Sequence, residues 1–138
     1  MKKLIIMGLA GDPSPASYPD CEVWTVGRNR HDGASKYFEL HGLDFYGHKM
    51  ERPCKSVYDF AHTFNLPINN TICYMLVLAH ILGYTDIEIV GSPLTASKEY
   101  IKERPAVAYI IGYMSAFGAH IKWLGGIQNE DYGRDKIL

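Results

Sequence analysis

Short apolar runs separated by glycine- and proline-containing turns recur along the chain. The continuous run Leu4–Met7 is typical of a strand that is buried on both faces of a parallel sheet. Further strands are expected, in chain order, at Glu22–Val26, Lys36–Leu40, Asp86–Val90 and Ala119–Leu124. Most of these runs are followed by glycine or polar residues, so we expect their carboxyl ends to lead into polar loops.

Longer apolar patterns predict helices between these strands. Ile72–Leu82 is apolar almost all round and is closed by Gly83, which predicts a central, buried helix. A second helix is expected to begin at Glu103 or Arg104, with Pro105 in its first turn, and to run to Gly118. The segment Gly42–Pro67 shows no clear periodicity beyond a short strand expected around Lys55–Tyr58.

Strands that alternate with helices favour a mainly parallel sheet with right-handed crossovers. The 138 residues match the length of one domain, which is typically about 100–150 residues. We therefore predict a single Rossmann-like α/β domain over residues 1–138, with helices flanking the sheet and a ligand-binding role.

The charge balance excludes some partners. Fourteen basic and fifteen acidic residues give a net charge of -1, so we expect no binding to nucleic acid or to an anionic membrane surface. The apolar run at the start is short for a signal peptide and is interpreted as a strand. The three cysteines are widely spaced and neither they nor the histidines show metal-ligand spacing. We expect a cytoplasmic protein without a disulfide, a metal or another cofactor.

In an open parallel sheet, ligands bind beyond the carboxyl ends of the strands, where the strand order reverses. Gly8 and Gly11 follow the first strand and allow the backbone to approach a ligand, while Asp12 and Ser14 offer oxygen atoms to a phosphate or a ribose. This G-x-x-G-D-P-S loop is neither a dinucleotide fingerprint nor a P-loop. A plain turn is the alternative interpretation.

Other polar residues are expected near the same crevice. Arg28 and Asn29 follow the second strand, where they either contact a phosphate or a base edge or form a solvated loop. Asn70 and Thr71 are interpreted as the start of the buried helix, whose N-terminus also suits an anion. Arg104 either reaches the crevice or starts an exposed helix.

His41 is the histidine best placed for chemistry. It follows the strand Lys36–Leu40, and Glu39, two residues earlier, lies on the same face. A general base that is oriented by a carboxylate has this arrangement. A loop histidine without a catalytic role has it too, so both interpretations stay open.

The order of these pieces resembles a family of small bacteriophage proteins. That family is distantly similar to Rossmann-like sialyltransferases and to pterin-diphosphokinase-like proteins, whose first loop reads G-x-G-P-S. The matching stretches are Met7–Ser14, Trp24–Asn29, Tyr37–Gly42, Thr71–Gly91 and Glu99–Pro105. The resemblance implies that a cytidine-type nucleotide contacts Gly8, Gly11, Asp12, Ser14, Asn29, Thr71 and Ser92. It also implies a protein of the infected host's cytoplasm.

Three functions follow as alternatives. The first is a phage-encoded protein that binds a nucleotide-derived small molecule, such as a host immune signal, and sequesters it unchanged. The second is a small nucleotide-dependent transferase that acts on a sugar or a modified nucleotide, with His41 as base and Glu39 orienting it. The third is an oligomeric structural protein, in which further copies of the chain are the partner. The first loop departs from G-x-G-P-S, which favours binding over turnover.

Overall fold

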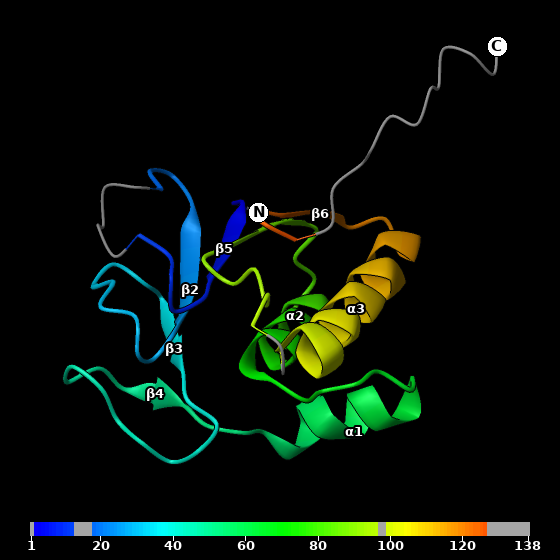
Figure 1. Cartoon of the computed structure of the whole chain (residues 1–138), viewed down its shortest axis with the longest axis horizontal. Coiled ribbons are helices and arrows are strands. Elements are labelled where there is room, and N and C mark those ends of the chain that lie inside the picture. Colours follow the sequence, from blue (N-terminus) through cyan, green and yellow to red (C-terminus); the bar gives the residue numbers. More distant parts are fainter. Residues whose placement is uncertain (1, 13–17, 97–98, 127–138) are drawn as a thin grey trace, which may run out of the picture.

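The computed structural model describes residues 2–12, 18–96 and 99–126 (Figure 1). These residues form a six-stranded sheet in the order β4-β3-β2-β1-β5-β6, in which every neighbouring pair is parallel. The strands are β1 (Leu4–Met7), β2 (Glu22–Val26), β3 (Lys36–Phe38), β4 (Met50–Glu51), β5 (Asp86–Val90) and β6 (His120–Trp123). The predicted Rossmann-like α/β fold with a parallel sheet is confirmed.

Helices α1 (Lys55–Thr63), α2 (Thr71–Ile81) and α3 (Arg104–Ala116) connect the strands, and a π-helical turn, η2 (Glu99–Glu103), leads directly into α3. The two expected helices are therefore confirmed. The strand expected around Lys55–Tyr58 is wrong, because this segment begins α1. Val57 and Ala61 are one helical turn apart and both are buried, so helical spacing places them against the core.

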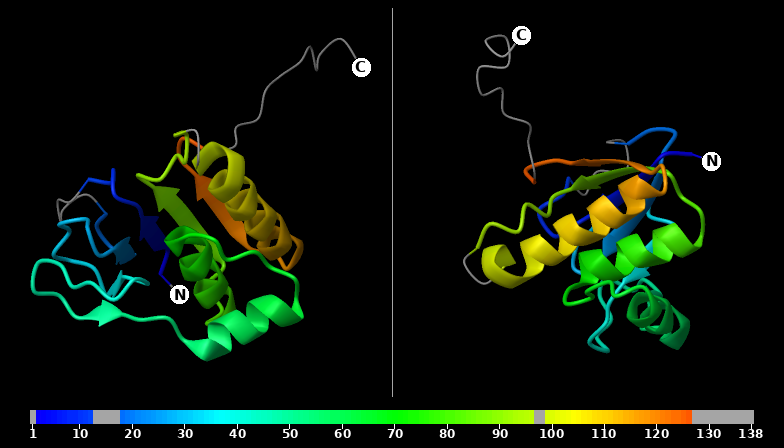
Figure 2. Two further views of the ribbon diagram at one scale, coloured as in Figure 1. Left: turned by 60° about the horizontal axis from the view of Figure 1, so that its bottom comes forward. Right: turned by 90° about the vertical axis from the view of Figure 1, so that its right-hand side faces the viewer.

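The helices α1, α2 and α3 lie on the same face of the sheet (Figure 2). Alternate strand residues, including Leu4, Ile6 and Trp24, pack against them in the main core. Residues of α2 from Ile72 to Val77 are all buried, which explains why its sequence is apolar on every side. On the opposite face a smaller cluster of Ile5, Met7, Val23 and Val90 packs against loop residues.

β1 lies between β2 and β5. The chain passes from β1 to β2, β3 and β4 on one side and then returns to β5 and β6 on the other, so the strand order reverses at β1. The carboxyl ends of these strands share one edge of the sheet. The loops that follow β1, β2, β3 and β5 meet at this edge and supply most of the predicted site residues. In the part of the chain that the structure describes, no helix is both long and apolar enough to cross a membrane.

Candidate functional site

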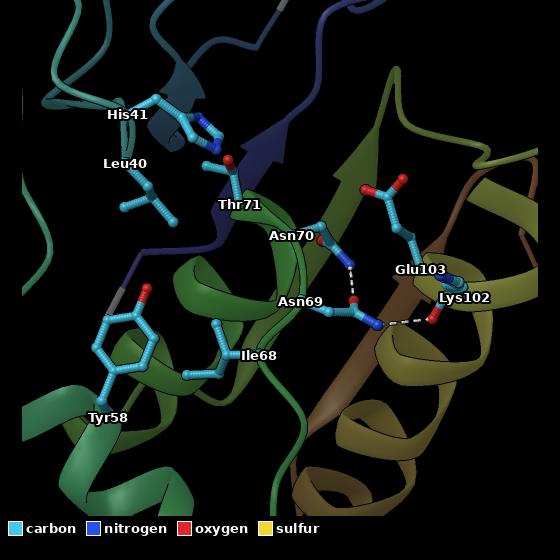
Figure 3. Close-up of a pocket in the computed structure, with 9 residues that line it drawn as sticks. All are labelled: Leu40, His41, Tyr58, Ile68, Asn69, Asn70, Thr71, Lys102 and Glu103. Atoms are coloured by element: carbon cyan, nitrogen blue, oxygen red, sulfur yellow. Dashed lines mark hydrogen bonds between the residues drawn. The ribbon is translucent and has the colours of Figure 1, made fainter. Parts of the chain in front are cut away.

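Three adjoining hollows lie along the carboxyl edge of the sheet. The largest, about 540 Å³, is the α2 hollow, which lies between the end of β3, helix α1, the start of α2 and the residues that precede α3 (Figure 3). The middle hollow, about 300 Å³, lies over the ends of β2 and β3. The third, about 260 Å³, is the arginine hollow, which includes Arg28 and Arg30 in its lining.

Shared residues connect the three hollows. His41 and Thr71 line both the α2 hollow and the middle hollow. Leu9 and Arg28 line both the middle hollow and the arginine hollow. The hollows therefore adjoin one another, and we refer to the three together as the edge groove, which extends over the ends of β1, β2 and β3 to the N-terminus of α2.

The Glu39–His41 pair lies at the centre of the edge groove. The Glu39 carboxylate accepts the backbone N–H of His41 at 2.6 Å, and its Oε1 lies 3.3 Å from the His41 Nδ1. The Glu39 side chain is 9% exposed and the His41 side chain 85% exposed. A buried carboxylate thus lies beside one nitrogen of an accessible imidazole, and the other ring nitrogen faces no partner in this pair.

Asparagines organise the wall of the α2 hollow (Figure 3). The Asn70 Oδ1 accepts the backbone N–H of Cys73 at 3.0 Å, which confirms the predicted cap of α2. The Asn70 side-chain amide donates to Asn69, whose own amide donates to the Lys102 carbonyl at 2.8 Å. These bonds tie the start of α2 to η2, and the first turn of α2 contains no acidic residue that would neutralise the helix dipole.

Cys73 lies behind this wall and is chemically inert. The residue is fully buried, and its Sγ accepts a hydrogen bond from Asn70. Burial raises the pKa of the Cys73 thiol to about 12. The side chain therefore stays protonated at neutral pH and contributes packing to the groove floor, not a nucleophile.

Asn29 is a predicted ligand contact, but its side chain forms hydrogen bonds within the protein. The side chain is buried, and its amide nitrogen donates to the carbonyls of Gly8 at 3.1 Å and Gly11 at 3.0 Å. Its Oδ1 accepts the backbone N–H of His31 at 2.9 Å. Asn29 borders the arginine hollow, yet its main contribution is to hold the loop after β1 against the loop after β2.

The glycines of the first loop are needed for contacts between loops. The amide of Gly8 donates to the carbonyl of Val90, and the amide of Ala10 donates to that of Gly91. A Cβ at Gly8 would lie 2.5 Å from the Cβ of Ser92, and one at Gly11 would lie 2.3 Å from the side chain of Met7. A side chain at either position would therefore collide with protein atoms, and Gly11 also lines the arginine hollow.

Ser92 and Arg104 lie outside the linings of the three hollows. The Ser92 carbonyl accepts the indole N–H of Trp123 at 2.9 Å. Arg104 donates to the carbonyls of Pro93 and Gly126, and its guanidinium lies 5.0 Å from the centroid of the Trp123 ring. Both residues stabilise the end of β6. Asp12 is exposed and does not line the groove, and Ser14 lies outside the described residues.

His31 is a buried residue that the sequence does not single out. It is 1% exposed, its Nδ1 accepts the N–H of Gly33 at 3.0 Å, and its Nε2 has no hydrogen-bond partner among the described residues. Burial lowers the pKa of the His31 imidazole, which favours the neutral form.

The groove also contains Tyr58, Lys102 and Arg30, which the sequence analysis did not identify as candidate site residues. Of these three residues, only Arg30 could have been identified from the sequence, because it lies two positions after the candidate Arg28.

Among residues 2–12, 18–96 and 99–126, no cluster of three or more His, Cys, Asp or Glu side chains is arranged to hold a metal ion. No protein-family model, curated protein or solved structure matches this chain.

Proposed function

We propose that the protein binds a nucleotide-like small molecule in the edge groove and holds it without transforming it. The observation that carries this proposal is that three hollows with shared lining residues adjoin along the carboxyl ends of β1, β2 and β3. Ligands of parallel α/β sheets bind at this edge. The groove also combines apolar walls, asparagine side chains and arginines, which together suit a molecule with a ring, hydroxyl groups and phosphate.

The resemblance to small bacteriophage proteins gives this binding a biological role. A phage protein that sequesters a nucleotide-derived signal of the host needs affinity and abundance, and it needs no turnover. The source of the ligand is therefore tested directly on protein isolated from cells.

The test is mass spectrometry of small molecules released by heating protein purified from phage-infected or signal-producing cells. We expect a nucleotide that is retained through purification, is released unaltered and binds again in a titration. Protein from uninfected cells that lack the signal is the control. If no nucleotide co-purifies and none of the common ribonucleotides binds the isolated chain, the proposal is wrong.

A transferase is the second candidate, and the Glu39–His41 pair is the observation that favours it. The Glu39 carboxylate lies 3.3 Å from the His41 Nδ1, and His41 lines two of the three hollows. A positioned imidazole of this kind contributes about 10²–10⁴-fold to a proton transfer. The same pair in a capture protein provides only hydrogen bonds to the ligand.

His41→Asn separates the two functions. Asparagine keeps a hydrogen-bonding group but cannot exchange protons as imidazole does, so for a capture protein we expect at most about a tenfold change in Kd, roughly 1.4 kcal/mol. Calorimetric titration and a turnover assay are run in parallel. His62→Asn, at an exposed position on α1, is the matched control. Turnover by the parent protein that collapses in His41→Asn without a change in Kd would establish the transferase instead.

A further inference from the structure

Two arginines of the loop after β2 are held against aromatic rings. The Cζ of Arg28 lies 5.3 Å from the ring centroid of Phe45, and the Cζ of Arg30 lies 4.9 Å from that of Tyr46. Such stacking limits the motion of a guanidinium and leaves N–H groups in the guanidinium plane to face a ligand. Tyr46 also holds Arg30 through a side-chain hydrogen bond and electrostatically, which raises the pKa of the Arg30 guanidinium. Both arginines are exposed and both line the arginine hollow, so their donors are accessible from the groove.

Among the described residues, no carboxylate forms an ion pair with Arg28 or Arg30. The ion pairs formed among the described residues involve Lys3, Lys36, His41, His48, Arg52 and Lys55 as the basic partners. Arg28 and Arg30 therefore bring two positive charges to one end of the groove. Arg52, an exposed arginine that follows β4, differs from both, because it forms an ion pair with Asp44.

The opposite end of the groove has a different character. Leu40, Tyr58 and Ile68 form an apolar side of the α2 hollow, and Asn69 and Asn70 lie beside them (Figure 3). An aromatic ring and neighbouring amides suit a planar heterocycle, which stacks on the ring and exchanges hydrogen bonds with the amides. The arginine hollow thus contributes two guanidinium groups, whereas the α2 hollow combines an apolar side and amides with one basic and one acidic residue, Lys102 and Glu103.

We propose that Arg28 and Arg30 bind a chain of two or more phosphates and that the heterocyclic end of the same ligand lies against Tyr58. This inference rests on the proposed function and adds the class and the direction of the ligand. Each guanidinium fork matches two phosphate oxygens, so two forks exceed what a single phosphate monoester presents. The ligand is a nucleoside diphosphate, a triphosphate or a molecule with an equivalent phosphate chain.

The test is calorimetric titration with the four ribonucleosides, their 5′-monophosphates and their 5′-diphosphates, together with inorganic pyrophosphate. For the parent protein we expect affinity to rise with each added phosphate. Arg28→Gln and Arg30→Gln each lower diphosphate affinity about ten- to a hundredfold and leave nucleoside affinity unchanged. Lys122→Gln, which removes an exposed charge from β6, leaves all affinities unchanged.

Tyr58→Ala tests the other end of the groove. It lowers the affinity of the nucleosides and of all their phosphates by the same factor and leaves pyrophosphate binding unchanged. A phosphate-dependent gain that persists in both arginine variants overturns the inference and leaves the proposed function standing. Failure of every nucleoside and nucleotide to bind the parent protein overturns both. Because the substituted side chains are exposed, thermal melts of the variants are expected to match the parent's.

Discussion

Gly91→Ala is expected to destabilise the protein by about 2–5 kcal/mol, the largest effect of a single methyl group that we predict. Gly91 follows β5 and has a φ of +68°, a conformation that costs an alanine roughly 1–2 kcal/mol. A Cβ at this position would also lie 2.0 Å from the backbone nitrogen of Gly11 and 2.4 Å from its Cα. Backbone atoms cannot yield as a flexible side chain does, so the two loops must separate.

Thermal and urea denaturation measure this effect, with an expected fall in Tm of about 8–20 °C. Gly83→Ala is the matched control, because Gly83 has a φ of +88° and an added Cβ there would meet nothing within 4 Å. The control retains the conformational cost of about 1–2 kcal/mol and lacks the collision. Equal losses of stability in the two variants would show that the loops after β1 and β5 are not in contact.

Asn29→Ala is expected to cost about 2–4 kcal/mol, because it leaves several backbone groups without partners. The carbonyls of Gly8 and Gly11 lose their donor, and the backbone N–H of His31 loses its acceptor. These groups are screened from water by the buried surroundings of Asn29, which is 3% exposed. An unsatisfied buried polar group costs more than the net energy of the bond it had formed.

Chemical denaturation measures the free energy of unfolding of Asn29→Ala, with Asn69→Ala as the matched control. Asn69 is exposed and donates to the Lys102 carbonyl, which water can satisfy after substitution, so its loss is expected to stay within about 1 kcal/mol. The Asn29 variant also loosens the boundary of the arginine hollow, and nucleotide affinity is expected to fall with stability. Retention of full stability by Asn29→Ala would mean that the two loops are held by other contacts.

The parallel sheet was predictable because its strands are short runs rich in β-branched and aromatic residues, bounded by turn residues, and Leu4–Met7 is apolar throughout. Leu4–Met7 is buried at every position, as its continuous apolar sequence predicts for a strand covered on both faces of a parallel sheet. The segment between residues 42 and 67 was not predictable to the same degree. Strand β4 has only two residues, and α1 buries only Val57 and Ala61, so neither produces a long periodic signal.

The site was predictable where its geometry is local. Glu39 and His41 are two positions apart in the loop that begins directly after β3, so the local chain places them together without help from distant segments. The roles of Gly8, Gly11 and Asn29 depend instead on loops that the fold brings into contact, such as those around Gly11 and Gly91. A sequence pattern identifies such residues as unusual, but it does not distinguish contact with a ligand from contact with another loop.

The central position of β1 determines when the chain can fold during synthesis. Leu4 pairs with Glu22 on one side and with Ile87 on the other, so one edge of β1 stays unpaired until β5 has left the ribosome. At about 5–20 residues per second, the roughly eighty intervening residues take on the order of 4–16 s to make. The nascent chain therefore carries an open, apolar strand edge for seconds, and an open edge of this kind is a template for aggregation that chaperones must cover.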